Sequence, residues 1–148
     1  MANVVLANDH GAVELAETFV KHLTERGYTV NHLGVTTSDS VDYPDMAELG
    51  CKEFKKGGYV FGVLLCGTGI GISISANKIE GIRCALPQNG YAAAMARKHN
   101  DVNFIAFGGR IEYCEDPISI LDAYIDATFE GDRHQRRVDK IMALEGRS

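Results

Sequence analysis

The chain has 148 residues, of which 45% are hydrophobic and 24% are charged. This length and composition predict one soluble globular domain that spans residues 1–148. A formal net charge of −5 argues against nonspecific nucleic-acid binding, and no apolar run approaches the roughly 18 residues of a transmembrane helix.

Four widely spaced cysteines form neither a C-x-x-C motif nor a zinc-ligand pattern: Cys51, Cys66, Cys84 and Cys114. Reduced thiols in a cytoplasmic protein are the simplest interpretation, with Cys51 and Cys84 in the core. The N-terminus begins with strand-like residues and lacks the charged and apolar regions of a signal peptide. We therefore expect a cytoplasmic protein with no nucleic-acid partner, no membrane partner and no metal.

The predicted elements of the first half alternate between strands and helices. Hydrophobic spacing predicts strands over 3–7, 28–33 and 59–65, and helices over 13–23 and 45–55. Between them, 36–44 is expected to be a polar loop that stops at Pro44. The third strand is apolar almost end to end, as a central parallel strand should be.

The second half continues the alternation. The pattern predicts helices over 73–78, 91–99, 118–128 and 138–144, and strands over 82–86 and 104–107. Such alternation favours a Rossmann-like, three-layer α/β sandwich with a five-stranded parallel sheet. Polar residues follow the strands at 9–10, 66–71, 88–89 and 109–110, so the site is expected at the carboxyl edge of the sheet.

Cys66 ends an apolar run and begins the segment Cys66-Gly67-Thr68-Gly69-Ile70-Gly71. One interpretation is an inert thiol, since most buried cysteines behave as small hydrophobic residues. The glycines favour a second interpretation. If a helix follows the loop, its free N–H groups stabilise a thiolate, which could act as a nucleophile or a base. The loop has neither the Walker sequence nor the dinucleotide-binding fingerprint.

Other polar residues also permit a structural and a functional interpretation. Asp9 and His10 are either a helix cap beside a surface histidine or a pair that holds a hydroxyl or takes its proton. His99 closes a predicted helix, as a partner of the helix dipole or as an acid–base group. Guanidinium groups at Arg110, Arg133 and Arg137 suit phosphate oxygens, although a solvated charged turn is the simpler explanation of the C-terminal arginines taken alone.

Together, these residues resemble the type B ribose-5-phosphate isomerases and the related galactose-6-phosphate isomerase subunits. The resemblance covers nearly the whole chain and rests on the order and spacing of short motifs. They are Asn8-Asp9-His10-Gly11, 40–45, 66–73, Ala76-Asn77-Lys78, Gly81-Ile82-Arg83, Arg97, His99-Asn100-Asp101, Gly109-Arg110 and 129–138.

The resemblance implies an isomerase that needs no metal and no cofactor. It would interconvert ribose 5-phosphate and ribulose 5-phosphate through an enediolate, in the pentose phosphate pathway. Cys66 would move a proton between C1 and C2, Thr68 would assist proton movement between oxygens, and His99 would open the furanose ring. Asp9 would handle a sugar hydroxyl.

The resemblance also implies a set of substrate-binding residues and an assembly. The backbone N–H groups of Gly67, Thr68, Gly69, Ile70 and Gly71 would stabilise the enediolate oxygen, which fits the requirement for preorganised donors. Tyr43 and Asn100 would line the sugar site. Phosphate would bind His10, Arg110, Arg133 and Arg137, in part from the neighbouring subunit of a homodimer, or of a tetramer of such dimers.

Two positions depart from the family pattern, and other functions stay open. The segment 87–92 differs from the usual sequence, and Asp132 stands where the family usually has glycine. An allose- or galactose-6-phosphate isomerase is the nearest alternative, although galactose-type subunits often lack the thiol of Cys66. A noncatalytic sugar-phosphate binding protein is the second alternative. A thiol redox protein is disfavoured because no resolving cysteine lies nearby.

Overall fold

A computed structural model describes residues 2–146. The chain forms two compact units, and each is described by itself. The first unit comprises the chain up to Leu86 together with Asn103–Glu112, and the second comprises Pro87–Val102 and the chain from Tyr113 onward. The expectation of a single domain over residues 1–148 stays a prediction.

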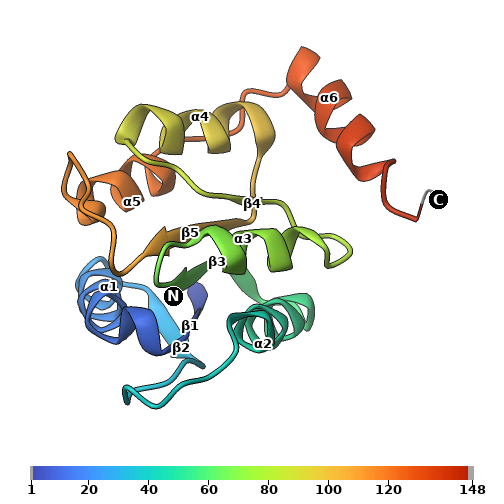
Figure 1. The fold of residues 1–148 in the computed structure, drawn as a ribbon. Helices are drawn as coiled ribbons and strands as arrows, with labels where there is room; N and C mark the ends of the chain where they lie inside the picture. Colours follow the sequence, from blue (N-terminus) through green and yellow to red (C-terminus); the bar gives the residue numbers. More distant parts are fainter. Residues whose placement is uncertain (1, 147–148) are drawn as a thin grey trace. The chain divides into compact units, whose positions relative to one another are not determined.

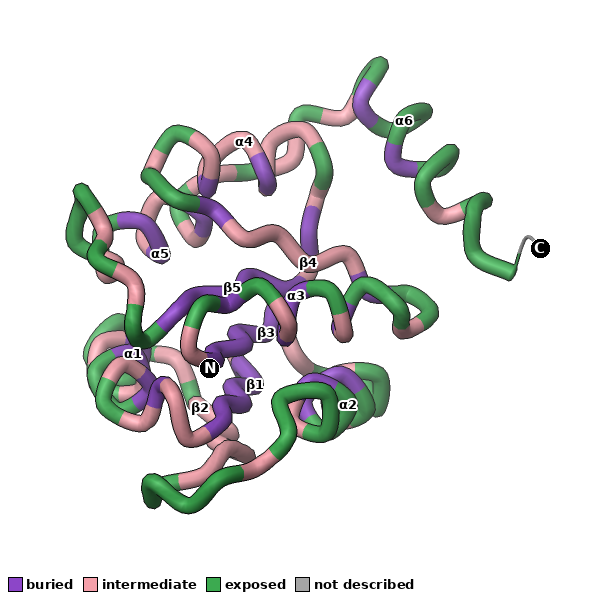
Figure 2. Tube along the Cα trace, viewed as in Figure 1, coloured by how far each residue is buried: buried purple, intermediate pink, exposed green. Residues whose placement is uncertain are grey.

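The first unit contains a parallel sheet of five strands in the order β2-β1-β3-β5-β4 (Figure 1). The strands are β1 (Asn3–Asn8), β2 (Thr29–His32), β3 (Tyr59–Cys66), β4 (Cys84–Ala85) and β5 (Phe104–Gly108). The three central strands are the most deeply buried part of the chain (Figure 2), as their apolar sequences predict. The predicted five-stranded parallel sheet is confirmed.

Helices cover both faces of this sheet. The ring of Phe107 packs edge-on against Phe19 of α1 (Val13–Glu25), with 4.9 Å between centroids. Phe104 meets Phe54 of α2 (Tyr43–Lys55) in the same manner at 5.1 Å. Residues three apart on a strand point to opposite faces, so α1 and α2 lie on opposite sides of the sheet. With α3 (Ile70–Asn77) beside α2 (Figure 1), they complete the predicted three-layer sandwich.

Two predicted boundaries in the first unit are wrong for local reasons. Pro44 does not end a loop but lies in the first turn of α2. Proline is tolerated there because the N–H groups of the first turn have no acceptor within the helix. The fourth strand shrinks from 82–86 to two residues. The N–H of Ile82 donates to the carbonyl of Ile79, and that of Arg83 donates to Oδ1 of Asn103, so neither N–H can join a ladder.

The second unit consists of α4 (Gly90–Asn100), α5 (Pro117–Ile125) and α6 (Arg133–Met142). The buried hydroxyl of Tyr124 on α5 donates to the carbonyl of Val102 just after α4, at 2.7 Å. Helix α6 begins five residues before its predicted start, because His134 and Val138 form a buried stripe within a charged sequence. Among the described residues, no helix is long and apolar enough to cross a membrane.

Candidate active site

The carboxyl ends of β1, β3 and β5 lie side by side and are tied together by their own backbones. The N–H of Asp9 donates to the carbonyl of Leu65 at 3.0 Å. The N–H groups of Gly109 and Arg110 donate to the carbonyls of Cys66 and Gly67, both at 2.9 Å. The sheet edge expected from the sequence therefore brings the first, third and fifth strand ends into one cluster.

Two glycines allow these loops to approach one another. Gly69 has a φ of 79°, and a Cβ there would lie 2.8 Å from the carbonyl carbon of Phe107. A Cβ at Gly11 would lie 2.9 Å from the backbone nitrogen of Gly67. Side chains at these positions would separate the loops after β1, β3 and β5, so the glycine spacing serves close backbone packing.

Helix α3 follows the loop directly, as the functional interpretation of the glycines requires. The N–H of Gly69 donates to Sγ of Cys66 at 3.1 Å, and the N–H of Ile70 donates to Oγ1 of Thr68 at 3.2 Å. Among the described residues, the N–H groups of Gly67, Thr68 and Gly71 have no recorded hydrogen-bond acceptor. Unpaired N–H groups at the start of a helix can hold an anion.

Cys66 is more enclosed than a base at a strand end is expected to be. The residue exposes 4% of its surface and belongs to the hydrophobic cluster that includes Ile72 and Ala76 of α3. A thiol in this position is shielded from bulk water, while the only hydrogen bond recorded for its sulfur among the described residues comes from the adjacent loop.

Asp9 and His10 have well-defined partners. Oδ1 of Asp9 accepts the N–H of Gly11 at 2.8 Å, which caps the short 3₁₀ helix His10–Ala12, so the cap interpretation of this carboxylate is confirmed. Nδ1 of His10 lies 3.2 Å from the N–H of Val41 and accepts it. The proton of the neutral ring therefore resides on Nε2, which is available as a donor.

Tyr43 and Arg110 flank the glycine loop. The ring of Tyr43, at the first residue of α2, occupies the space that a Cβ on Gly71 would need, and Tyr43 is 42% exposed. The guanidinium of Arg110 lies beside Gly67, where a Cβ would be 3.4 Å from Nη1. Both predicted substrate-binding side chains thus border the Cys66 loop.

The other four predicted site residues belong to the second unit. His99 and Asn100 end α4, while Arg133 and Arg137 lie on α6, four residues apart and exposed. The ring of His99 stacks on that of His134, with centroids 4.1 Å apart and planes inclined by 9°.

Sequence reasoning missed Glu130 and His134, which surround His99. Glu130 Oε1 lies 3.5 Å from Nε2 of His99 and 3.7 Å from Nε2 of His134. Burial lowers the pKa of His134, helped by the positive charges of His99, Arg133 and Arg137 and opposed by Glu130. The sequence feature that could have indicated them is their spacing: Glu130, His134 and Val138 follow one another at intervals of four residues, the spacing of one helix face.

The remaining cysteines differ in exposure. Cys51 is fully buried, as predicted, and burial raises the pKa of its thiol to about 12. Cys84 is only partly buried because it lies on the edge strand, and burial also raises its pKa. Cys114 is exposed, and none of the four forms a disulfide.

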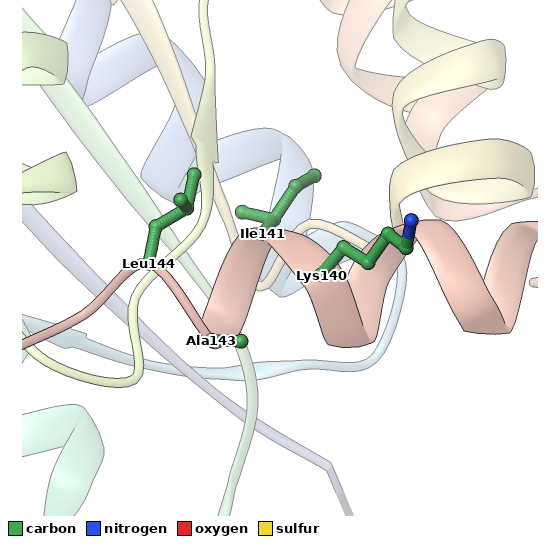
Figure 3. A pocket seen from close by; sticks show the side chains of 4 residues that line it. All are labelled: Lys140, Ile141, Ala143 and Leu144. Carbon is green, nitrogen blue, oxygen red and sulfur yellow. The ribbon is translucent and has the colours of Figure 1, made fainter. Parts of the chain in front are cut away.

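A pocket of about 410 Å³ lies along the end of α6 (Figure 3). It is lined by Lys140, Ile141, Ala143 and Leu144. None of the predicted site residues contributes to it, and Ile141 and Leu144 are 42% and 61% exposed. The pocket is therefore a partly apolar surface feature of α6 and is distinct from the cluster around Cys66.

Comparison with known proteins gives a consistent result over the whole chain. The family model described as Ribose/Galactose Isomerase matches residues 4–141. Ribose-5-phosphate isomerase B of Escherichia coli is 42% identical over 147 residues, covering 99% of each chain. D-erythrulose-4-phosphate isomerase of Pectobacterium atrosepticum is 38% identical, covering 98% of this chain and 96% of the relative. The structure of Clostridium thermocellum ribose-5-phosphate isomerase B superposes with a TM-score of 0.93 at 40% identity, covering 97% of each chain.

Proposed function

The chain belongs to the ribose/galactose isomerase family, and from that premise we propose that it interconverts ribose 5-phosphate and ribulose 5-phosphate. The observation that carries this proposal is the cluster at one sheet edge of a cysteine, a glycine loop with unpaired N–H groups, and cationic or hydrogen-donating side chains. An aldose–ketose isomerase needs these three elements: a base, a site for a developing oxyanion, and a phosphate anchor.

Cys66 is the proposed base. In the open-chain sugar it takes the proton from C2, the C1 carbonyl becomes an enediolate oxygen, and the proton returns to C1 to give the ketose. The N–H groups of Gly67, Thr68 and Gly71 are proposed to stabilise the charge that develops on oxygen. Those of Gly69 and Ile70 would join them once they leave Sγ of Cys66 and Oγ1 of Thr68. Because Cys66 is enclosed, water is kept away from the thiol and from the C2 proton that it removes. The proton therefore returns to C1 of the same substrate instead of exchanging with water.

The other side chains supply hydroxyl handling and anchoring. Oγ1 of Thr68 accepts the N–H of Ile70, which leaves its own proton free to move between the substrate oxygens. Asp9 holds a sugar hydroxyl with the carboxylate oxygen that does not cap the 3₁₀ helix. Nε2 of His10 donates to phosphate, and Arg110 adds a positive charge beside the loop.

The residues of the second unit complete the proposal. His99 opens the furanose ring before isomerisation, and Asn100 lines the sugar site. Arg133 and Arg137 share one side of α6 and clamp phosphate. We further propose a homodimer, or a tetramer of such dimers, in which these arginines serve the neighbouring subunit. The apolar side chains exposed on α6 support this assembly.

No step requires a metal or a cofactor, and the four free thiols agree with a cytoplasmic enzyme of the pentose phosphate pathway. Two other substrates have specific support. The similarity to D-erythrulose-4-phosphate isomerase supports a four-carbon ketose phosphate as an alternative substrate. The galactose branch of the family favours a six-carbon sugar phosphate.

The deciding experiment assays the wild-type protein with aldose and ketose phosphates of four, five and six carbons. Turnover of the pentose pair in preference to the others supports the proposal. Preference for a tetrose or hexose pair assigns the alternative, and tight binding without turnover of any pair assigns a noncatalytic binding protein.

The role of Cys66 is tested separately by Cys66→Ala. We expect the turnover number to fall by at least about 1000-fold, because the proton acceptor is lost, while calorimetry still detects substrate binding. Cys114→Ala, which removes an exposed thiol outside the site, is the matched control and should keep wild-type turnover. Wild-type turnover in Cys66→Ala contradicts the assignment of the base.

A further inference from the structure

His99 belongs to a cluster of metal-ligating side chains in the second unit. His99 ends α4, His134 lies on α6, and Glu130 lies in the segment before α6. Their ligating atoms, one ring nitrogen from each histidine and a carboxylate oxygen, all lie within 4.8 Å of one another. The proposed isomerisation uses His99 alone and leaves the other two without a chemical role.

The burial of His134 distinguishes this cluster from a group of charged side chains on the surface. The residue is 5% exposed, and its Nε2 has no hydrogen-bond partner among the described residues. That nitrogen faces Oε1 of Glu130 at 3.7 Å, beyond hydrogen-bond distance. Buried polar atoms are nearly always satisfied, so this one is suited to a ligand that would supply the missing interaction.

We propose that His99, Glu130 and His134 bind a divalent transition-metal ion of the Zn²⁺ type, and that the bound ion inhibits the isomerase. Two imidazole nitrogens and one carboxylate form a common zinc ligand set, which leaves a fourth position for water. Ligand atoms around tetrahedral zinc lie about 3.3 Å apart, given bonds of about 2.0–2.2 Å. The 3.5 and 3.7 Å separations from Glu130 exceed that value by only a few tenths of an ångström.

The stacked rings determine how the ion would act. A metal ion lies in the plane of each imidazole that binds it, so two rings inclined by 9° and stacked at 4.1 Å cannot both direct Nε2 at one ion. One ring has to turn. The side chain of His99 is 38% exposed, whereas that of His134 is 6% exposed, so His99 is the ring with room to turn.

Metal binding thus occupies Nε2 of His99 and changes the orientation of its ring. This inhibitory consequence rests on the proposed role of His99 in ring opening, whereas the binding itself does not. Arg133 and Arg137 oppose a cation here, and Glu130 is the carboxylate that offsets them.

The binding test titrates the full-length protein with Zn²⁺ in a Cys114→Ser background, which removes the exposed thiol. Calorimetry should give one ion per chain, and NMR should show Nε2 of His99 and His134 shifting together. Glu130→Gln and His134→Gln should each weaken binding by at least about 10-fold. Asp139→Asn, a carboxylate change on the same helix outside the cluster, is the control and should bind as the parent does.

The outcomes separate the two parts of the proposal. Unchanged Zn²⁺ affinity in Glu130→Gln and His134→Gln, or loss of binding only in Cys66→Ala, overturns the metal site. Binding at the cluster with full isomerase activity supports the site and overturns the inhibition, and with it the role of His99. Absence of pentose phosphate turnover in the metal-free wild type refutes the proposed function while leaving the binding result intact.

Discussion

At the scale of single residues, His32 is held by a hydrogen bond in a fixed direction. Its Nε2 lies 2.6 Å from Oδ1 of Asn8, a fully buried residue. The amide nitrogen of Asn8 donates to the carbonyls of Asp9 and Val35, so Oδ1 is the acceptor and Nε2 of His32 carries the proton. This arrangement links the end of β2 and, through Val35, the loop that follows it to the carboxyl end of β1.

His32 should make stability depend on pH. Burial lowers its pKa, so the unfolded chain binds a proton at a higher pH than the folded chain. The free energy of unfolding should therefore fall as the pH drops below about 6.5 and level off below the pKa of the folded state. His134 contributes in the same direction.

The prediction is checked by urea unfolding between about pH 5 and pH 8, the range in which the imidazole titrates. In His32→Gln the loss of stability on acidification should be smaller than in the wild type, with a remainder due to His134. An equal loss in both proteins would show that His32 does not couple folding to protons.

Asp132 has a backbone conformation that suits glycine. Its φ is 49° and its ψ is −127°, and its side chain makes no capping hydrogen bond to α6. Residues other than glycine in such regions store on the order of 1–3 kcal/mol of strain.

We expect Asp132→Gly to raise the free energy of unfolding by about 1 kcal/mol, the relief of strain less the added freedom of the unfolded chain. Asp132→Ala removes the same carboxylate but keeps a Cβ, so it should give no such gain. Denaturant midpoints measure both variants. Equal stabilisation by alanine would attribute the effect to charge instead of backbone strain.

Local sequence was sufficient for residues whose partners are near in the chain. The cap by Asp9 and the four-residue spacing of Arg133 and Arg137 follow from short-range rules. The enclosure of Cys66 and the burial of His134 could not be predicted. They depend on how α3 packs on β3 and on how α6 meets the end of α4, which are long-range contacts.

At the scale of elements, β4 is an edge strand whose outer side is covered by one side chain. The N–H of Cys84 donates to Oδ1 of Asn77 at 2.8 Å, and Nδ2 of Asn77 donates to the carbonyl of Cys84 at 2.9 Å. The amide of Asn77 thus imitates a neighbouring strand. Covering of this kind prevents an edge from pairing with another chain.

Asn77→Ala should lower the free energy of unfolding by about 1 kcal/mol, because both hydrogen bonds are lost and water replaces them only in part. Asn77→Asp keeps the acceptor for the N–H of Cys84 and loses the donor, so an intermediate value is expected. Hydrogen exchange should report faster exchange at Cys84 in the alanine variant. Unchanged stability and exchange would mean that Asn77 does not protect the edge.

The elements best predicted from sequence are those with a continuous apolar signal. β1, β3 and β5 fall within one residue of their predicted ends, since each is buried on both faces. β4 and α6 were predicted poorly. Oδ1 of Asn103 accepts the N–H of Arg83, so this N–H cannot pair with a neighbouring strand and β4 is shorter than predicted. In α6 the buried residues are few and lie among arginines, so the hydrophobic pattern of the helix is weak.

At the scale of the whole molecule, the proposed homodimer predicts a mass in solution of twice one chain, or four times for the tetramer. Ile141 and Leu144 expose apolar surface on α6, and Ile141→Glu would introduce a charge there. We expect light scattering to show a smaller assembly for this variant. Val60→Glu is the control, because Val60 is 49% exposed at the opposite end of β3 from the site. A monomeric wild type contradicts the proposal.

The strand order has a consequence for how the protein is made. Within residues 2–146, β4 pairs only with β5, and β5 also pairs with β3, yet β5 is the last strand along the sequence. A polypeptide still emerging from the ribosome and shorter than Gly108 would hold the fourth strand without a neighbour and leave one side of β3 uncovered. The sheet can close only after synthesis has passed that glycine, so until then the incomplete chain would expose apolar surface and unpaired strand edges that favour aggregation.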